Sequence, residues 1–168
     1  MKLNKAYTLK YRRRREGKTD YKARLSLLLS RKLRVVVRRK LNNIIVHVVE
    51  FNEKGDKTLV SGNSRELLDF GWKGHRGNAP SAYLTGLICG LKASKKGIKE
   101  GILDSGPNRI VKCSNIFAAV KGLRDGGLQL PCNEEYFSKE ERLAGHHAKQ
   151  GVKEQFNEVK NKIIQKWH

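Results

Sequence analysis

The 168-residue chain carries 36 Lys and Arg against 16 Asp and Glu, a formal net charge of +20. Its length suits one domain with a substantial core, and so large a positive excess indicates a polyanionic partner, nucleic acid ahead of an anionic membrane. The sequence has no apolar run of the roughly 20 residues that a membrane span needs and no apolar segment behind its basic N-terminus that would make a signal peptide, so we expect no membrane partner.

The positive charge is concentrated at the N-terminus. The first 40 residues hold 16 Lys and Arg but only two acids, whereas the remaining residues hold 20 basic and 14 acidic side chains. We expect residues 1–19 to form a basic RNA-binding arm, extended as far as Lys18. Arg12, Arg13, Arg14 and Arg15 are consecutive and cannot pack into a core. Their planar guanidinium groups suit bidentate contact with phosphate and stacking on bases.

A helix is predicted over residues 20–31. Thr19 or Asp20 can cap its N-terminus. Leu25, Leu28 and Leu29 follow the helical i, i+3, i+4 spacing and predict an apolar stripe. Arg24 and Arg31 are seven residues apart and share a face, as on a helix with one side against RNA.

Three strands are predicted next, over residues 33–39, 44–51 and 58–61, joined by turns at 40–43 and 54–56. The first two are rich in β-branched residues, and the second is almost continuously apolar. Arg34, Arg38 and Arg39 are expected to keep the ends of the first strand in solvent. Together the strands predict an antiparallel meander.

Helical patterns dominate the rest of the chain. Asn63 and Glu66 resemble a capping box for a short helix, and Asn78 can cap a longer helix that ends at Gly97. We expect Gly86 and Gly90 to let that helix lie close on the sheet. A fourth strand is predicted over residues 98–104, and a helix from residue 114 or 115 to the Gly126–Gly127 pair.

Two further helices are predicted near the C-terminus. Ser138 and Glu141 resemble a capping box for a helix that reaches about Lys149. After Gly151, apolar residues recur at helical spacing up to Trp167. This last stripe could be core, a helix that binds a partner protein, or a membrane-surface helix. We favour docking on the chain's own body or on a neighbouring protein, because its polar face is not strongly basic.

These elements define the expected fold class. It is α/β, with a mixed sheet that contains an antiparallel three-strand meander packed against helices, a basic N-terminal arm and a helical C-terminal tail. We expect a single α/β domain over residues 20–132 and a helical extension over residues 133–168.

A loop over residues 71–77 has three glycines at even spacing. Backbone amides freed by glycine can cradle phosphate, and the helix that starts near Asn78 adds a positive dipole. Trp72 would offer an aromatic platform and Lys73, His75 and Arg76 polar contacts to RNA. The alternative is an ordinary flexible loop with Trp72 in the core.

Nothing in the sequence indicates an enzyme. Gly17-Lys18-Thr19 resembles the end of a phosphate-binding loop, but the required earlier glycine is replaced by Arg12 and no strand precedes it. The aspartates are isolated, so no two-metal nuclease site is predicted. Cys89, Cys113 and Cys132 fit neither a zinc pattern nor a disulfide framework. We therefore expect no catalytic residues, metal, cofactor or small-molecule substrate.

Several ordered motifs resemble one known family. Residues 11–21 (YRRRREGKTDY), 36–39 with Asn42-Asn43, and 71–75 (GWKGH) with Gly77-Asn78 are similar to the archaeal and eukaryotic branch of the large-subunit ribosomal protein that binds 5S ribosomal RNA. This is family eighteen in the universal naming. Further matches lie at 82–86, 101–104, 117–119, 121–122 and 125–128, so the resemblance covers roughly residues 7–148. The Trp-Lys-Gly-His form resembles the archaeal type.

The resemblance implies a cytoplasmic, structural constituent of the large ribosomal subunit. It implies contact with 5S rRNA, with large-subunit rRNA and with a neighbouring 5S-binding ribosomal protein in the central protuberance, and no catalysis. A general architectural DNA-binding protein and an RNA-processing enzyme are the alternatives; the first lacks a recognition helix and the second clustered acids. The expected RNA-binding residues are Tyr11, Arg12, Arg13, Arg14, Arg15, Lys18, Thr19, Tyr21, Arg24, Arg38, Arg39, Asn42, Asn43, Trp72, Lys73, His75 and Arg76.

Overall fold

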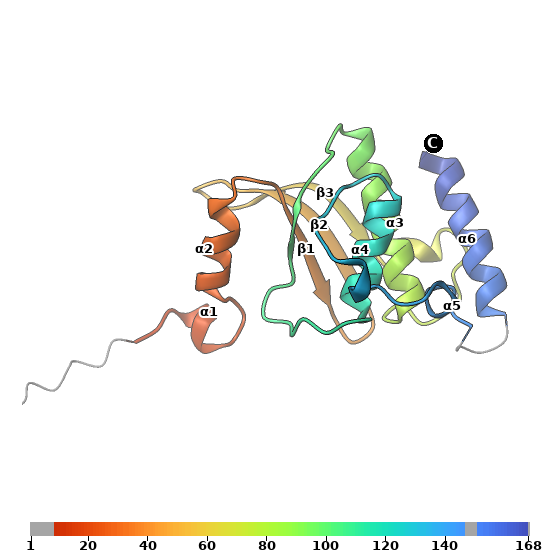
Figure 1. Cartoon of the computed structure of the whole chain (residues 1–168), viewed down its shortest axis with the longest axis horizontal. Coiled ribbons are helices and arrows are strands. Elements are labelled where there is room, and N and C mark those ends of the chain that lie inside the picture. The colour runs from red at the N-terminus through yellow and green to blue at the C-terminus, as the bar shows by residue number, and fades with distance from the viewer. Residues whose placement is uncertain (1–8, 147–150, 168) are drawn as a thin grey trace, which may run out of the picture.

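A four-stranded mixed sheet packed with helices forms the body of the chain, as the sequence predicts (Figure 1). The computed structural model describes residues 9–146 and 151–167. The strand order is β3-β2-β1-β4. The first three strands are antiparallel neighbours and form the expected meander, while β4 runs parallel to β1. The strands are β1 (Arg34–Arg39), β2 (Ile44–Glu50), β3 (Lys57–Asn63) and β4 (Ile102–Asp104).

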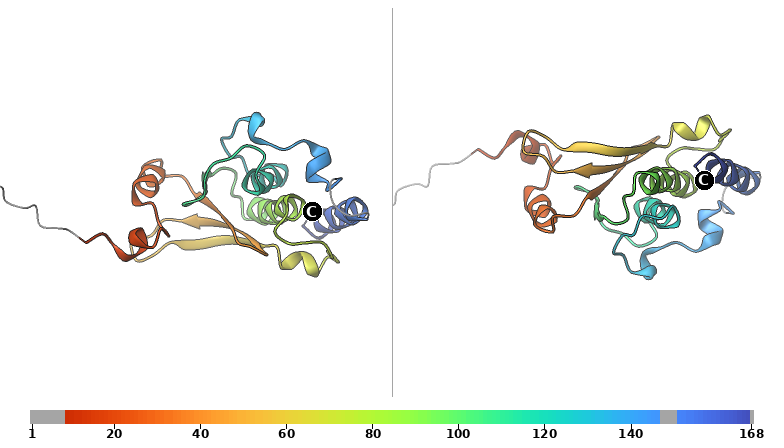
Figure 2. Two further views of the ribbon diagram at one scale, coloured as in Figure 1. Left: turned by 90° about the horizontal axis from the view of Figure 1, so that it is seen from below. Right: turned by 90° about the horizontal axis from the view of Figure 1, so that it is seen from above.

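The helices lie in layers on either side of this sheet. Figure 2 shows α1 and α2 on one side of the strands, α3 and α4 on the other, and α6 beyond α3. No helix in the described ranges is long and apolar enough to cross a membrane. The helices are α1 (Arg12–Arg15), α2 (Tyr21–Leu29), η1 (Glu66–Leu68), α3 (Ala79–Lys95), α4 (Asn115–Asp125), η2 (Glu134–Tyr136), α5 (Glu140–Leu143) and α6 (Val152–Trp167).

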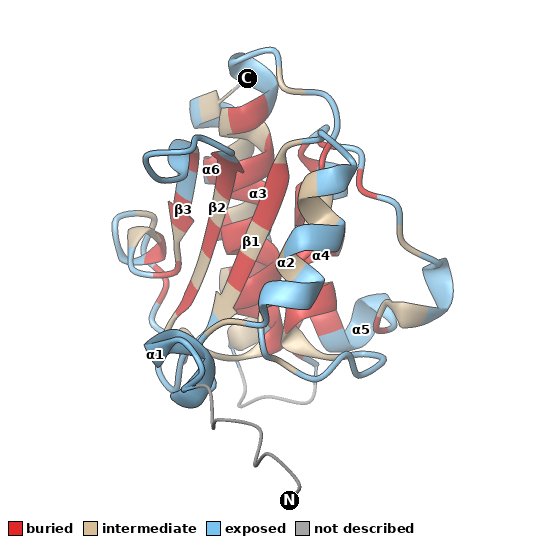
Figure 3. Cartoon of the chain, turned by 90° about the vertical axis from the view of Figure 1, so that its left-hand side faces the viewer, coloured by how far each residue is buried: buried red, intermediate tan, exposed pale blue. Residues whose placement is uncertain are grey.

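The main core lies between the sheet and α3. Alternate strand residues point to opposite faces, so Val35, Val37, Val46 and Val48 are all fully buried on the side toward α3. The other face of the sheet is less covered, and Figure 3 shows it partly open beside α1 and α2. Polar groups on that open face therefore remain available to interact with the arm or with a ligand.

Glycines bring α3 and α4 into direct backbone contact. A Cβ on Gly86 would lie 2.1 Å from the carbonyl oxygen of Ala119, and a Cβ on Gly90 would lie 2.7 Å from that of Leu123. From α4, a Cβ on Gly122 would lie 2.0 Å from the carbonyl oxygen of Tyr83. The prediction that the glycines of α3 face the sheet is therefore wrong: they face α4.

The arm is not extended throughout the described residues. The four arginines form the short helix α1, because arginine is a good helix former and Glu16 lies 3.8 Å from Arg12 one turn earlier. Gly17 then reverses the chain at φ +63°. The following helix, α2, is capped by Asp20, whose carboxylate accepts from the backbone N–H groups of residues 22 and 23.

The leucine stripe of α2 is not buried as predicted. Leu25 and Leu29 are exposed, and α2 has no buried residue at all. The helix ends at Leu29, so Arg31 lies beyond it with φ +54° and does not continue the face that carries Arg24. The helix is held by polar contacts instead of a core, as described below.

The C-terminal segments differ partly from prediction. The α5 helix ends at Leu143, and a turn with Gly145 at φ +86° follows; positions 147–149 of the predicted helix lie outside the described residues. Ser138 does not cap this helix, since its hydroxyl donates to the carbonyl of Cys113. The fourth strand is also shorter than predicted, because residues before Ile102 make only a single bridge, between Glu100 and Gln129.

The last helix packs on the chain's own body. Phe156, Val159 and Ile163 of α6 are buried in the same core cluster as α3. The Phe156 ring lies 5.5 Å from the ring of Tyr83 on α3, centroid to centroid. This confirms the prediction that the apolar stripe docks on the body.

Replacing Gly122 by alanine tests the close helix contact. We expect Gly122→Ala to lower the free energy of unfolding by about 1–3 kcal/mol, because the new methyl group overlaps the Tyr83 carbonyl and forces α3 and α4 apart. Urea unfolding measures it. The control is Ser26→Ala on the exposed surface of α2, which should change the value by less than about 0.5 kcal/mol. An unchanged stability of Gly122→Ala would contradict the packing.

Candidate nucleic-acid interface

The N-terminal arm folds back on itself and presents its arginines to solvent. Residues 12–15 are all exposed, and α1 has no buried residue. Tyr11, 77% exposed, packs its ring 5.6 Å from the ring of Tyr21, centroid to centroid, which ties α1 to α2. Arg13 donates from Nε to the Thr19 hydroxyl at 2.9 Å, a second tie across the turn. The arm therefore offers a cluster of guanidinium groups on a folded hairpin of helices.

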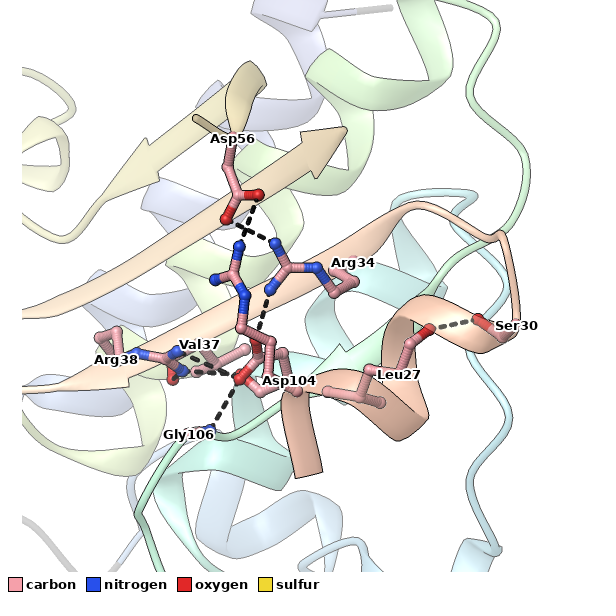
Figure 4. A network of polar contacts seen from close by, with 9 residues as sticks. Leu27, Ser30, Arg34, Val37, Arg38, Asp56, Asp104 and Gly106 are labelled. Carbon is pink, nitrogen blue, oxygen red and sulfur yellow. Dashed lines mark hydrogen bonds and ion pairs between the residues drawn. The ribbon is translucent and has the colours of Figure 1, made fainter. Parts of the chain in front are cut away.

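A chain of ion pairs fastens this hairpin to the sheet (Figure 4). Arg24 of α2 donates to Asp56 at 2.9 Å, and Asp56 also accepts from Arg34 of β1 at 2.5 Å. Arg34 donates in turn to Asp104 at the end of β4, at 2.9 Å, and Asp104 accepts from Arg38 at 3.0 Å. We call these five residues the arginine clamp. It joins α2, β1, β4 and the β2–β3 hairpin.

The centre of the clamp is buried, and this burial makes its ion pairs important for the stability of the fold. The side chains of Arg34 and Asp104 are 3% and 9% exposed. Removing one partner of such a buried pair leaves the other charge unpaired in a poorly solvated place, which is strongly unfavourable. Asp104 also accepts from the backbone N–H of Gly106 at 2.8 Å, and the Asp104 carbonyl accepts from Arg38. The carboxylate is thus held by three donors.

The clamp was not predicted. The sequence places Arg34 at a strand end in solvent, whereas Arg34 is buried. It also indicates isolated aspartates, whereas Asp56 and Asp104 both bind Arg34. A signal was present in the strand itself. Arg34 and Arg38 are four residues apart in β1 and therefore share a face, and a shared face of two arginines requires nearby acids.

Nine of the 17 predicted RNA-binding residues fall in two clusters. The first surrounds a cleft of about 380 Å³ between the arm and the end of β4, which we call the arm cleft. The second surrounds an open hollow of about 610 Å³ between the β1–β2 turn and the glycine loop. The arm cleft includes Arg13, Lys18, Thr19, Arg24 and Arg38; the hollow includes Asn42, Lys73, His75 and Arg76.

Both clusters lie at the same end of the molecule. Figure 1 places α1, the β1–β2 turn and the loop before α3 along the lower edge of the view. The turn and the glycine loop are in close contact, since a Cβ on Gly77 would lie 2.7 Å from the Leu41 carbonyl oxygen. Asn115 secures the same loop by donating to the Gly77 carbonyl at 2.7 Å. Basic residues from distant parts of the sequence thus form one end surface.

Trp72 is not part of that surface. It is 1% exposed, and its Nε1 donates to the His75 carbonyl at 3.5 Å. A Cβ on Gly74 would lie 2.8 Å from the indole ring, so the loop folds tightly over the ring. The prediction that Trp72 offers a platform to RNA is wrong. Of the alternative, an ordinary flexible loop with Trp72 in the core, the structure shows the core position of Trp72.

The other loop and turn residues differ in accessibility. Lys73, His75, Arg39 and Asn42 are exposed, and Arg76 is half-buried. Asn43 is half-buried, and its Oδ1 is buried without a hydrogen-bond partner among the described residues.

His47 of β2 lies on the open face of the sheet and adds no positive charge to it. Burial and, secondarily, the nearby Arg38 lower the pKa of His47 below its ordinary value. The His47 side chain is half-buried.

Fold and surface together define a basic α/β nucleic-acid-binding protein, in which cations of the arm and of the glycine loop lie at the same end of the molecule. Residues 5–100 match the model of a family described as "Ribosomal large subunit proteins 60S L5, and 50S L18". The chain is also 49% identical, over 149 residues, to the large ribosomal subunit protein uL18 of the archaeon Methanococcus maripaludis. The alignment covers 89% of this chain and 77% of that relative. The chain belongs to this family of structural ribosomal proteins, in its archaeal type.

Replacing Asp104 by asparagine tests the clamp. Asp104→Asn keeps the shape but leaves Arg34 with only the more exposed Asp56 as counter-charge, so we expect the free energy of unfolding to fall by up to about 3–5 kcal/mol. Urea unfolding measures it. Asp69→Asn, at an exposed acid, is the matched control and should change stability by less than about 0.5 kcal/mol. Equal stabilities of the two variants would refute the structural weight given to the clamp.

Proposed function

We propose that this protein binds 5S rRNA, and large-subunit rRNA beside it, and so helps to attach the 5S rRNA in the central protuberance of the large ribosomal subunit. The observation that carries the proposal is the gathering of the arm cleft, the hollow and the arginines of α1 at one end of the molecule. Membership in a family of large-subunit ribosomal proteins supports an rRNA partner. The protein acts in the cytoplasm, within the ribosome.

The mechanism is charge neutralisation combined with recognition of shape. The exposed guanidinium groups of α1 replace counter-ions on phosphates, which makes affinity depend on salt. The positions of the cations on a folded body then select a matching arrangement of phosphates, 2′-hydroxyls and unstacked bases, as is usual for folded RNA. The clamp contributes by holding α2 on the sheet, because this fixes the position of the α1 arginines relative to the glycine loop.

A protein partner is also part of the proposal. A neighbouring 5S-binding ribosomal protein would contact this chain on the assembled RNA. The apolar face of α6 is not available to such a partner, because its apolar residues are already buried against α3. The outer, polar side of α6 remains open to contact.

Replacing the four arginines of α1 by alanine tests the RNA interface. We expect the full chain with this change to bind 5S rRNA about 10–1,000-fold more weakly at ~0.1 M salt, and the slope of log affinity against log salt to flatten by about 3. Filter binding across a salt series measures both, with duplex DNA of equal length as competitor. The fold should persist, since none of the four side chains is buried.

The control removes the same amount of charge elsewhere. Four exposed lysines outside the arm, the clamp and the linings of both the arm cleft and the hollow are replaced by alanine, and this variant should keep most of the affinity. Equal losses in the two variants would mean that only net charge matters, and equal affinity for RNA and duplex DNA would favour a general architectural protein. The control positions are Lys99, Lys139, Lys153 and Lys162, all exposed.

A further inference from the structure

The arm cleft has two kinds of wall. Four cations line it and outnumber its two acids, Asp20 and Asp104; three of them are Arg13 from α1, Arg24 from α2 and Arg38 from β1. Apolar side chains line it as well, among them Leu27 of α2 and Leu103 of β4. The volume of about 380 Å³ is within the range of about 300–1,000 Å³ that small-molecule sites occupy. The cleft therefore suits a ligand group that is flat and apolar and also carries negative charge nearby.

The cations of the cleft are held in place by the protein. Arg38 donates to the carbonyls of Val37 and Asp104 at 3.0 and 2.8 Å, so its guanidinium is fixed at the wall. A Cβ on Gly106 would lie 2.8 Å from the Arg38 Cζ, so this guanidinium packs directly on the backbone of the loop after β4. Arg13 is held through Nε by Thr19. Within the described residues, no hydrogen bond engages the two terminal nitrogens of Arg13.

The apolar part of the cleft is open to solvent. Ile110, in the loop after β4, is 62% exposed, and Ala23 on α2 is exposed as well. A phosphate group alone would not cover these apolar side chains. A site that binds only phosphate would need cations and no apolar wall. A nucleobase covers apolar surface with its faces, and its backbone phosphate stays within reach of a fixed guanidinium.

We propose that the arm cleft receives one unstacked base of the bound RNA, packed against Leu27 and Ile110, with Arg13 on the adjoining phosphate. The proposal rests on the proposed function and deepens it, because it names the chemical group that one part of the interface selects. The cleft would disfavour paired nucleotides, since a base inside a helix must lose its stacking and pairing to enter it. It would thereby favour RNA with an unpaired nucleotide at that place over a regular duplex of equal charge.

Filling the cleft without changing any charge tests the proposal. Ala23→Phe places a ring in the cleft from the exposed surface of α2. We expect it to weaken binding of the full chain to 5S rRNA by about 5- to 150-fold, the loss of one stacked base. The salt slope should stay unchanged, because every phosphate contact remains. Leu25→Phe is the matched control: it lies on the same helix, is 60% exposed and does not line the cleft. Its affinity should equal that of the unaltered chain.

A second variant keeps the test decisive if Ala23→Phe fails to fold. Ile110→Ser removes apolar wall at an exposed position and should weaken binding in the same direction with the same salt slope. Equal affinities of Ala23→Phe, Ile110→Ser and Leu25→Phe would overturn the base site while leaving 5S rRNA binding intact. Failure of the unaltered chain to bind 5S rRNA would overturn the proposed function itself, and the base site with it.

Discussion

The position of the RNA-facing surface depends on two carboxylates, Asp56 and Asp104. In the arginine clamp they bind the side chains of Arg24, Arg34 and Arg38. They thereby join α2, which follows the arm, to β1, β4 and the β2–β3 hairpin. Neither α1 of the arm nor the following helix α2 has a buried apolar residue. Charge pairing replaces a hydrophobic core as the means of attachment, and the pairing is effective because its centre is withdrawn from water.

Because of this attachment, the two faces of the sheet have different roles. One face of the sheet packs its valines on α3, which meets α4 through glycine contacts and carries α6 on its outer side. That half of the molecule holds the hydrophobic core. The other face and the lower end carry the arm, the open hollow and the glycine loop, where cations outnumber the acids that could neutralise them. A polyanion can bind there without disturbing the core.

Much of the fold could be predicted from local signals. The β-branched runs, the Asp20 and Asn78 caps and the apolar stripe of α6 are short-range patterns, and each produced the expected element. What failed depends on contacts between distant residues. The partner of Gly86 is a backbone 33 positions away, the clamp joins Arg34 to Asp104 across 70 positions, and Trp72 belongs to a core cluster that includes residues of the sheet and α3. Such pairings depend on the topology of the fold, which the spacing of apolar residues along the sequence does not reveal.

The central claim is that RNA binds the end of the molecule that carries the arm and the glycine loop. Amide hydrogen exchange of the full chain, free and bound to 5S rRNA, tests this most directly, because it reports every segment at once. The account predicts slower exchange on binding at residues 11–24, 38–43 and 73–77, with no change in the β2–β3 hairpin or in α6. Protection concentrated in the hairpin or α6, with the arm unaffected, would contradict it.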